Sequence, residues 1–566
     1  MNRAAGLFCL GAALFAQAAF GQGSPNSAQK PIAPDAQTVV YRNARIYTND
    51  PGHPWAEALV VRGEFLLGVI GETGVAQWAA QGTPIIDLHG AFVLPGFNDA
   101  HVHLGGAGTD LLHVQLNGVA SIPELQRRIR EAAAARKPGE WIVGSGWDHT
   151  LWPEKRFPTR QQLDAAAPGN PVLLTHVSGH VAVASSLALQ LAGVSKATAN
   201  PSGGEIERDA AGEITGMLKE DAAMALVEKK IPPLTPEQRR KGIELALADA
   251  AKNGVTSLQD NSAWEDFLVY RELRKEGRLT ARITEWLPFP APLERLEALR
   301  REGGTTDPWL RTGALKMVAD GALGSRTAAM LAPYADEPGT RGIMTIEPEK
   351  LRELAIARDR AGFQLAFHAI GDRANRVALD VFEAVAKANG PRDRRGRIEH
   401  AQVIALEDIP RFAQLAVIAS MQPSHETTDM RWAEQRVGPQ RAKGAYAWAS
   451  LQNSGARLAF GTDYDVEPLS PLRGLYACVT RELPAGGPAG GWQPQEKISL
   501  AECIRAYTSG SAYAQFEEGK KGELQEGEYA DFVVLSADLT KIPPSQYTKT
   551  HVLRTVVGGR TVYQEN

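Results

Sequence analysis

Two histidines spaced two residues apart, His101 and His103, offer the clearest chemistry in the chain. On a β-strand, residues i and i+2 point to the same face, so both imidazoles can reach one ion. Zinc-type sites use neutral imidazole nitrogens and carboxylate oxygens as ligands. Such a pair alone is a weak signal, because it occurs often by chance. It becomes a strong signal beside the other ligand-type residues of the chain.

Further ligand-type residues stand at or near the C-terminal ends of apolar, strand-like runs. They are Lys316 with Asp320, His368, His400 and Asp463. In a barrel of parallel strands, the C-terminal ends all face the active site. We therefore expect residues hundreds of positions apart to converge at one barrel mouth.

The strand-like runs that must position these residues alternate with amphipathic helical stretches. This alternation is typical of a parallel βα fold. The candidate strands are GFNDAHVH, VLLTHVSGH, GVTSLQD, RITEWLPF, ALKMVADG, QLAFHAIGD, RIEHAQV, VIASMQP and RLAFGTD. These are nine candidates for eight barrel positions, and residues 104–234 are too long for one βα connection. We therefore assign VLLTHVSGH to an insertion over the barrel mouth.

The pattern of expected elements at both ends of the chain differs from that in the middle. Residues 38–95 and 516–566 contain short strands separated by turns, so we expect one small β domain built from both ends. The barrel would then occupy residues 96–515.

The first residues predict a secretory signal. Arg3 is followed by no charged residue until Lys30, and the apolar run 4–20 ends in small residues. The run is weaker than the roughly 20 strongly apolar residues that span a bilayer. We expect a signal peptide at 1–21, a linker at 22–37, a periplasmic or secreted protein, and no membrane attachment after cleavage.

Composition narrows the function classes. The chain has 566 residues, 43% hydrophobic and 22% charged, which excludes a mainly disordered or multi-span membrane protein. Its net charge of −4 predicts no binding to nucleic acid, because phosphates require a positive excess. Three cysteines, Cys9, Cys478 and Cys503, are too few for a disulfide framework or a thiolate zinc cage. With Cys9 removed, the other two either pair or stay free.

Several segments together resemble the amidohydrolase superfamily. They are VLPGFNDAHVHL, LDAAAPGNPVLLTHVSGH, LKMVADGALGSRTA, FHAIGDRAN, RIEHAQ, MQPSH, FGTDYDVEPLSPL and EYADFVVL. The resemblance is closest to amidohydrolase family 3, with its YtcJ-like proteins and N-substituted formamide deformylases, and covers roughly residues 38–566. It implies an α/β fold, a distorted TIM (β/α)8 barrel with a small β-sandwich formed by both chain ends. One departure is Ser185 and Ser186, where relatives commonly carry an asparagine.

The resemblance also implies roles for the ligand-type residues. His101 and His103 would bind a first metal ion, His368 and His400 would hold a second, and a carboxylated Lys316 would bridge them. A free ammonium cannot bind a cation, so the lysine needs this modification. Asp463 would bind the first ion and carry a proton from the attacking water to the leaving nitrogen. Zinc is expected, as one or two ions, although cobalt, manganese or iron suit the same ligands.

Other residues are candidates for contact with substrate. His180 and His425 either bind the substrate or its oxyanion, or orient the ligands. Gln422 is a candidate for substrate contact. Trp147 and His149, in GWDHTLWPE, either line an apolar pocket or anchor the insertion.

Two further features are left open. Arg326 either faces the pocket or pairs with Asp320. Residues 427–446, with Arg431, Trp432, Arg436 and Arg441, form either a lid or a solvated helix face.

The leading interpretation is a secreted metal-dependent amidohydrolase that cleaves a C–N bond in an amide, formamide or cyclic amide by metal-activated hydroxide. Hydrolysis of an ester or lactone, or deamination of a ring, would use the same ligands. An inactive binding protein of this fold is the alternative from another class, but the complete ligand set argues against it. We expect a small-molecule substrate, and a homo-oligomer is left open.

Overall fold

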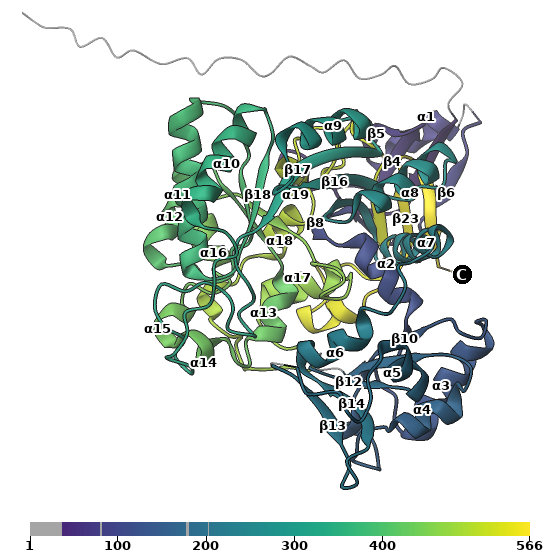
Figure 1. The fold of residues 1–566 in the computed structure, drawn as a ribbon. Coiled ribbons are helices and arrows are strands. Elements are labelled where there is room, and N and C mark those ends of the chain that lie inside the picture. Colours follow the sequence, from purple (N-terminus) through teal and green to yellow (C-terminus); the bar gives the residue numbers. More distant parts are fainter. Residues whose placement is uncertain (1–36, 80–81, 177–179, 202, 566) are drawn as a thin grey trace, which may run out of the picture.

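The computed structural model describes residues 37–79, 82–176, 180–201 and 203–565. The predicted signal peptide, and the predicted linker apart from Gln37, lie outside the described residues. The described chain forms a parallel barrel, an insertion on one side of it and a β-sandwich built from both ends (Figure 1).

Eight parallel strands form the barrel. In spatial order they are β8 (Phe97–Val102), β15 (Val255–Asp260), β16 (Arg282–Pro288), β17 (Leu310–Val318), β18 (Leu365–Ala369), β19 (Arg397–His400), β20 (Ile418–Met421) and β21 (Leu458–Phe460). The chain after β21 closes the barrel, because Val102 bridges Tyr464 in parallel and Asp463 N donates to His101 O at 2.8 Å. All eight predicted barrel strands are present, which confirms the distorted TIM barrel.

Helices connect these strands and cover the outside of the barrel. They include α2 (Leu104–Leu112), α7 (Pro236–Lys252), α8 (Trp264–Lys275), α9 (Leu293–Gly303), α10 (Pro348–Arg360), α11 (Asp372–Asn389), α12 (Ile409–Gln414) and α16 (Trp448–Asn453). Their apolar residues recur at helical spacing, as with Ala374, Ala378 and Phe382 on α11, which are buried.

Two glycines bring α2 and α7 into direct backbone contact. A Cβ atom at Gly108 would lie 2.7 Å from the carbonyl carbon of Gly242, and one at Gly242 would lie 2.5 Å from the Gly108 oxygen. Only glycine fits at both positions. This contact fixes the start of α2, which begins directly after His103.

The insertion has a sheet of its own. Its order is β13 (Glu205–Arg208), β14 (Ile214–Lys219), β12 (Val181–Ala184), β11 (Val172–His176), β10 (Ile142–Trp147) and β9 (Val114–Gln115). Val172 and Leu174 share one core and Leu173 lies in another, as expected when a strand is covered on both faces. The helices of the insertion are α3 (Ile122–Ala134), α4 (Arg160–Ala166), α5 (Ser186–Ala192) and α6 (Glu220–Glu228). The ninth candidate strand is therefore β11, outside the barrel sheet.

The β-sandwich combines both ends of the chain. One sheet has the order β5 (Phe65–Ile70), β4 (Ala58–Arg62), β1 (Thr38–Arg42) and β6 (Ile85–Asp87). The other has the order β24 (Arg560–Gln564), β23 (Val552–Val557), β22 (Phe532–Leu535), β7 (Phe92–Pro95), β2 (Arg45–Tyr47) and β3 (Trp55–Ala56). Tyr41 and Leu59 of the first sheet share a core with Val93 and Phe532 of the second.

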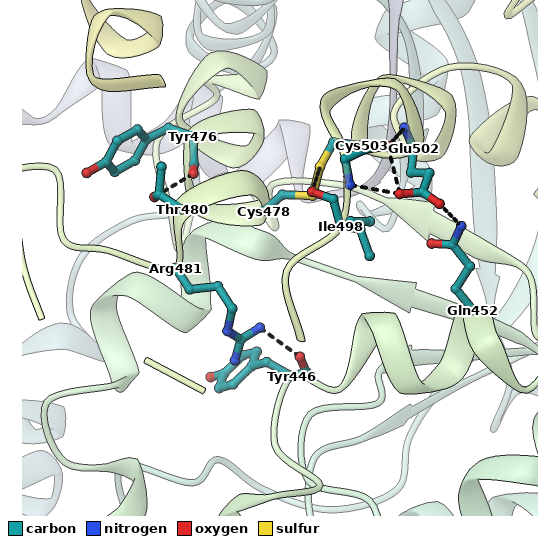
Figure 2. The surroundings of a disulfide bond; sticks show 10 residues. Tyr446, Gln452, Tyr476, Cys478, Thr480, Arg481, Ile498, Glu502 and Cys503 are labelled. Carbon is teal, nitrogen blue, oxygen red and sulfur yellow. Dashed lines mark hydrogen bonds between the residues drawn. A yellow bond between two sulfur atoms is a disulfide. The ribbon is translucent and has the colours of Figure 1, made fainter. Parts of the chain in front are cut away.

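A disulfide joins two helices that follow the last barrel strand. Cys478 on α17 (Pro471–Thr480) bonds Cys503 on α18 (Leu500–Ala506), and both side chains are fully buried (Figure 2). The two cysteines, left open by the sequence, are therefore paired. Among the described residues, no helix combines the length and apolar character needed to cross a bilayer.

Candidate metal centre

Side chains from the first and last strands of the barrel meet at its C-terminal mouth. His101 lies near the end of β8 and His103 directly follows that strand, while Asp463 lies just after β21. Asp463 Oδ1 lies 3.1 Å from His103 Nε2 and 3.7 Å from His101 Nε2. Asp463 Oδ2 lies 3.2 Å from His425 Nε2.

The other predicted ligands complete the same cluster. The ring centroid of His400 lies 5.1 Å from that of His101 and 4.5 Å from that of His368. Lys316 Nζ, on β17, lies 2.9 Å from His101 Nε2. Thus the six residues predicted as ligands are brought together from four strands, β8, β17, β18 and β19, and from the loop after a fifth, β21.

The outer ring nitrogen of each of the four histidines is held by a partner of its own. These Nδ1 contacts are His101 with Glu399 Oε2 (2.9 Å), His103 with Asn261 O (3.0 Å), His400 with Gln422 Oε1 (2.8 Å) and His368 with Asp320 Oδ1 (3.0 Å, close but poorly aligned for a hydrogen bond). All four partners are oxygens that can accept a hydrogen bond from the ring N–H. The neutral rings therefore carry the proton on Nδ1 and leave the Nε2 lone pairs for a ligand.

This arrangement tests whether a cation fits the site. Since Asn261 O can only accept, a neutral His103 turns an unprotonated Nε2 toward a carboxylate oxygen. Asp463 Oδ1 is buried and, within the described part of the chain, has no well-formed hydrogen bond. Lone pairs that face one another at this distance repel unless a cation lies among them. Nitrogen and carboxylate oxygen are also the donors that zinc-type ions prefer, so the residues fit a divalent metal.

Burial and neighbouring charges set the protonation of the cluster. Burial, together with the Lys316 charge, lowers the pKa of His101 to about 4, and burial holds the pKa of His400 well below its ordinary value. Burial lowers the pKa of Lys316 to about 8. Burial works to raise the pKa of Asp463, but the neighbouring imidazoles hold it well below its usual range. Burial works to lower the pKa of His103, but its contact with Asp463 raises it. The neutral rings of His101 and His400 beside the ionised Asp463 are the ligand forms that a metal requires, and a metal would displace a proton from His103.

Glu399 supports the cluster and was not singled out from the sequence. It is fully buried on β19, where Arg397 Nε donates to Oε1 at 2.5 Å and Arg397 Nη2 donates to Oε2 at 3.2 Å. Burial works to raise the pKa of Glu399, but the Arg397 charge and the His101 hydrogen bond hold it at about 2. The only sequence signal was an acidic residue directly before His400 in RIEHAQ.

Asp320 connects two loops beside the metal centre. Its carboxylate is fully buried and accepts hydrogen bonds from the backbone nitrogens of Ala329, Ile370 and Gly371, at 3.0, 3.0 and 2.8 Å. It therefore ties the loop after β17 to the end of β18 and lies beside His368.

The backbone near the ligands is unusual. His400 and Asp463 have positive φ angles of 72° and 59°, a region that non-glycine residues rarely adopt. Gly461 lies so close to β8 that a Cβ would come within 2.6 Å of Asp99 Oδ1 and His101 N. Such strained positions persist only where the surroundings fix them, and they cluster at functional sites.

Two of the predicted substrate residues lie at the centre, but as partners of ligands. Gln422, just after β20, uses Oε1 to orient His400, and His425 on α13 (Pro423–Asp429) contacts Asp463. Gln422 Nε2 is buried and has no hydrogen-bond partner among the described residues, so its N–H groups are left for a ligand.

The other three lie in the insertion, and each has a contact inside it. Trp147 is fully buried and donates to Leu174 O at 3.0 Å, so it packs the core of the insertion and is not a wall of a substrate pocket. His149 packs against Phe157 with ring centroids 4.4 Å apart. His180 Nδ1 lies 3.0 Å from Glu220 Oε2. Trp147 and His149 pack within the insertion because its double-sided sheet has to fill its own cores, whereas His180 is an exposed partner of Glu220.

The arginine-rich segment 427–446 is fixed to a neighbouring loop. Arg436 pairs with Asp336, and Arg441 donates to Ala332 O and Pro333 O at 2.9 and 2.7 Å. Arg326 also pairs with Asp336, at 2.9 Å, and not with Asp320. These charges are used within the protein because the β17–α10 loop supplies matching acceptors.

The chain matches a model of the amidohydrolase family over residues 84–563. Protein LONG AFTER FAR-RED 3 of Arabidopsis thaliana is 36% identical, covering 95% of this chain and 94% of that protein. The putative amidohydrolase YtcJ of Bacillus subtilis strain 168 is 34% identical, covering 88% and 95%. N-substituted formamide deformylase of Arthrobacter pascens is 28% identical, covering 92% and 97%.

Solved structures share the fold. An uncharacterized metal-dependent hydrolase from Pyrococcus furiosus is 32% identical, with a TM-score of 0.73 over 90% of this chain and 100% of that one. Atrazine chlorohydrolase TrzN from Arthrobacter aurescens TC1, complexed with zinc, has a TM-score of 0.53 over 93% and 95%. At 15% identity the second likeness shows the fold alone.

Proposed function

This chain belongs to the amidohydrolase family and is a metal-dependent hydrolase, and from that premise we propose that it hydrolyses a C–N bond of an amide, formamide or cyclic amide. The observation that carries the proposal is the cluster of imidazoles around Asp463. The Nδ1 atoms of His101, His103 and His400 are hydrogen-bonded, and the Nε2 atoms of His101 and His103 lie 3.7 and 3.1 Å from Asp463 Oδ1. A bound divalent ion supplies two effects, polarisation of the substrate carbonyl and a lower pKa for water.

Asp463 is the proposed proton carrier. One oxygen of its ionised carboxylate, Oδ1, lies near His103, and the other, Oδ2, lies 3.2 Å from His425. An ionised carboxylate can take a proton from water and return it to the leaving nitrogen. His425 would steady Asp463 or donate a hydrogen bond to the developing oxyanion.

Lys316 is proposed to be carboxylated. The lysine is buried beside His101, and its lowered pKa, about 8, provides the free amine that adds to carbon dioxide. The addition forms one N–C bond and releases one proton, and the carbamate oxygens become anionic ligands. The number of ions, one or two, and their identity as zinc belong to the same proposal.

Bicarbonate dependence tests the carbamate. Chelator-treated protein, acidified to remove carbon dioxide, would be reloaded with metal in buffers with and without bicarbonate. Recovery of metal content and activity only with bicarbonate is expected. Equal recovery in both buffers would show that Lys316 acts unmodified.

We also propose that the protein is exported to the periplasm or secreted. Support comes from the charge and hydropathy pattern of residues 1–21 and from the buried Cys478–Cys503 bond, since disulfides persist in oxidising compartments. Cell fractionation with an antibody to the C-terminus, and N-terminal sequencing of the product, test the proposal. A cytoplasmic protein that keeps Met1 would contradict it.

Turnover of N-formyl and N-acyl substrates tests the C–N assignment. The named activity of the Arthrobacter pascens relative is the reason to begin with N-substituted formamides. We expect turnover to require metal and to fall about 10²- to 10⁴-fold in Asp463→Asn. Asp380→Asn, an exposed substitution on α11, is the matched control and should change nothing.

Esters, lactones and ring amines belong in the same panel. Preference for one of them would replace the C–N assignment but keep the hydrolase. Metal-replete protein that binds these compounds without turning any of them over would favour the binding-protein alternative.

A further inference from the structure

A second pocket lies at the opposite end of the barrel from the metal centre. It has a volume of about 730 Å³ and is formed by the N-terminal ends of β16 and β17, the end of α9 and the chain before β18. Residues from 515 to 520, which lead into the β-sandwich, form its remaining wall. Pockets of this volume suit small organic ligands.

Trp286 separates this pocket from the metal centre. Its side chain lines the pocket and its ring centroid lies 5.1 Å from that of His101. Lys316 Nζ lies 5.4 Å from the same ring. A small molecule in the pocket would therefore contact Trp286 without reaching the metal-binding atoms, so the pocket is separate from the metal centre.

The charge of the pocket is one-sided. Its lining includes Arg300, Arg301, Arg311 and Lys520, and no acidic side chain is among the described lining residues. Glu517, buried behind the wall, pairs with Arg311 and lies 3.3 Å from Lys520 Nζ. The single negative charge of Glu517 cannot neutralise Arg311, Lys520 and the arginines of α9 together.

The two arginines of α9 that line the pocket, Arg300 and Arg301, have no carboxylate partner among the described residues. Burial lowers the pKa of Arg300, with Glu297 raising it and Arg301 lowering it. Arg300 lies over the Phe363 ring, 3.8 Å from its centroid, and donates to Ala361 O at 3.1 Å. Neither arginine has a carboxylate within 4.0 Å among the residues described, so both remain available to an anion.

An amide donor in the same wall also lacks a partner. Gln515 is only 6% exposed, and its Oε1 accepts from Thr284 Oγ1 at 2.8 Å. Its Nε2 is buried and meets no hydrogen-bond acceptor within the described chain. A buried donor without a partner costs about 1–3 kcal/mol, so a ligand oxygen that reached it would be favoured.

Aromatic surface completes the pocket. Phe516 is 42% exposed, which is unusual for a large apolar side chain, and it lines the pocket together with Phe363 and Trp286. From the unpaired cations, the free amide donor and these rings, we propose that the pocket binds a small organic anion, a carboxylate carried on an aromatic body. Arginine recognises a carboxylate with paired hydrogen bonds, and the rings cover the apolar part.

Calorimetric titration of the metal-loaded, full-length protein with benzoate tests the proposal. Benzoate should bind, whereas benzyl alcohol, of similar shape but without charge, should not. Arg301→Ser should weaken benzoate binding about tenfold or more, because a charge-assisted hydrogen bond is lost. Arg295→Ser, an exposed substitution on the same helix but outside the pocket, is the matched control and should bind as the unchanged protein does.

A second variant and an activity measurement separate this site from the metal centre, which also attracts carboxylates. Gln515→Leu should weaken benzoate binding, and both variants should retain full metal content and hydrolysis. Equal benzoate affinity in Arg301→Ser, Gln515→Leu and the unchanged protein would overturn the proposal. So would inorganic phosphate binding as tightly as benzoate, since the aromatic wall would then contribute nothing.

Discussion

Two arginine–glutamate pairs in this protein are equally buried but differ in ionisation. Arg397 and Glu399 lie on β19 beneath the metal centre, whereas Glu426 lies on α13 and Arg481 directly follows α17; all four side chains are fully buried. The pKa of Glu399 is held at about 2, mainly by Arg397, whereas burial raises the pKa of Glu426 to about 8. Burial alone therefore does not decide whether an acid is charged.

The difference lies in the hydrogen bonds. Arg397 contacts both oxygens of Glu399, at 2.5 and 3.2 Å, and His101 donates to one of them. Arg481 Nε lies 3.7 Å from Glu426, and among the described residues neither Glu426 oxygen has a hydrogen-bond partner.

Arg481 is stabilised by other groups. It donates to Trp492 O and Tyr446 O, at 2.6 and 3.0 Å, and lies over the Trp448 ring. Figure 2 shows Arg481 and Tyr446 near the disulfide. Direct hydrogen bonds therefore keep Glu399 ionised at the metal centre, whereas Glu426, which lacks such bonds within the described chain, is a neutral acid.

Glu399→Gln should have the largest effect, because it breaks the charged pair. Removing one partner of a buried ion pair typically costs about 3–5 kcal/mol of unfolding free energy. Loss of the Nδ1 acceptor of His101 should lower metal affinity or activity about 10- to 100-fold. Denaturant unfolding, metal analysis and kcat measure these effects. Stability and metal content equal to those of the unchanged protein would mean that Glu399 does not position His101.

Replacing both Cys478 and Cys503 by serine should destabilise the scaffold region without affecting the chemistry. The disulfide closes a chain segment of 25 residues, for which a loss of about 3 kcal/mol is expected. The ligands lie on other elements, so kcat at 25 °C should be unchanged. Thermal unfolding and kinetics should be compared with those of the unchanged protein under reducing conditions, where the two should match.

Gln422→Leu removes an uncharged partner of a metal-site histidine, whereas Glu399→Gln removes a charged one. His400 Nδ1 would lose its acceptor, and metal affinity or activity should fall about tenfold. The unfolding free energy should change less than in Glu399→Gln, because no buried charge is left unpaired. A loss of stability as large as that of Glu399→Gln would contradict this explanation.

Glu426→Gln should have the smallest effect near pH 5 and a growing effect as the pH rises. The folded pKa, about 8, lies above the ordinary value of 4.5, so the folded state holds a proton that the unfolded chain releases. Stability from this group is therefore full below pH 4.5 and is lost as the pH rises toward 8. The amide variant should match the unchanged protein near pH 5 and exceed it at pH 9. Urea unfolding across this range provides the measurement, and parallel curves would refute the raised pKa.

Much of the barrel could be predicted because its signals are local. Each strand is a short apolar run, five of the runs end in a predicted ligand, and the HxH spacing of His101 and His103 follows from strand geometry alone. The assignment of VLLTHVSGH to an insertion depended only on the length of the connection, and β11 does lie in a separate sheet.

The supporting residues could not be predicted in the same way. Glu399 and Asp320 act through partners far away in the sequence, His101 and the backbone of residues 329–371. The sequence left open whether Trp147 lines a pocket or anchors the insertion, because its burial depends on the helices that pack against β10. Arg326 and Arg436 meet at Asp336, a pairing that no spacing in the chain suggests.

The sequence by itself determined which residue types stand at the strand ends, and with them the barrel and the ligand set. Only the tertiary structure decided which ring nitrogen each histidine presents and which buried acid is charged. The physical reason is that strand patterning acts between neighbours in the chain, whereas hydrogen-bond partners and burial are set by elements that meet only after folding.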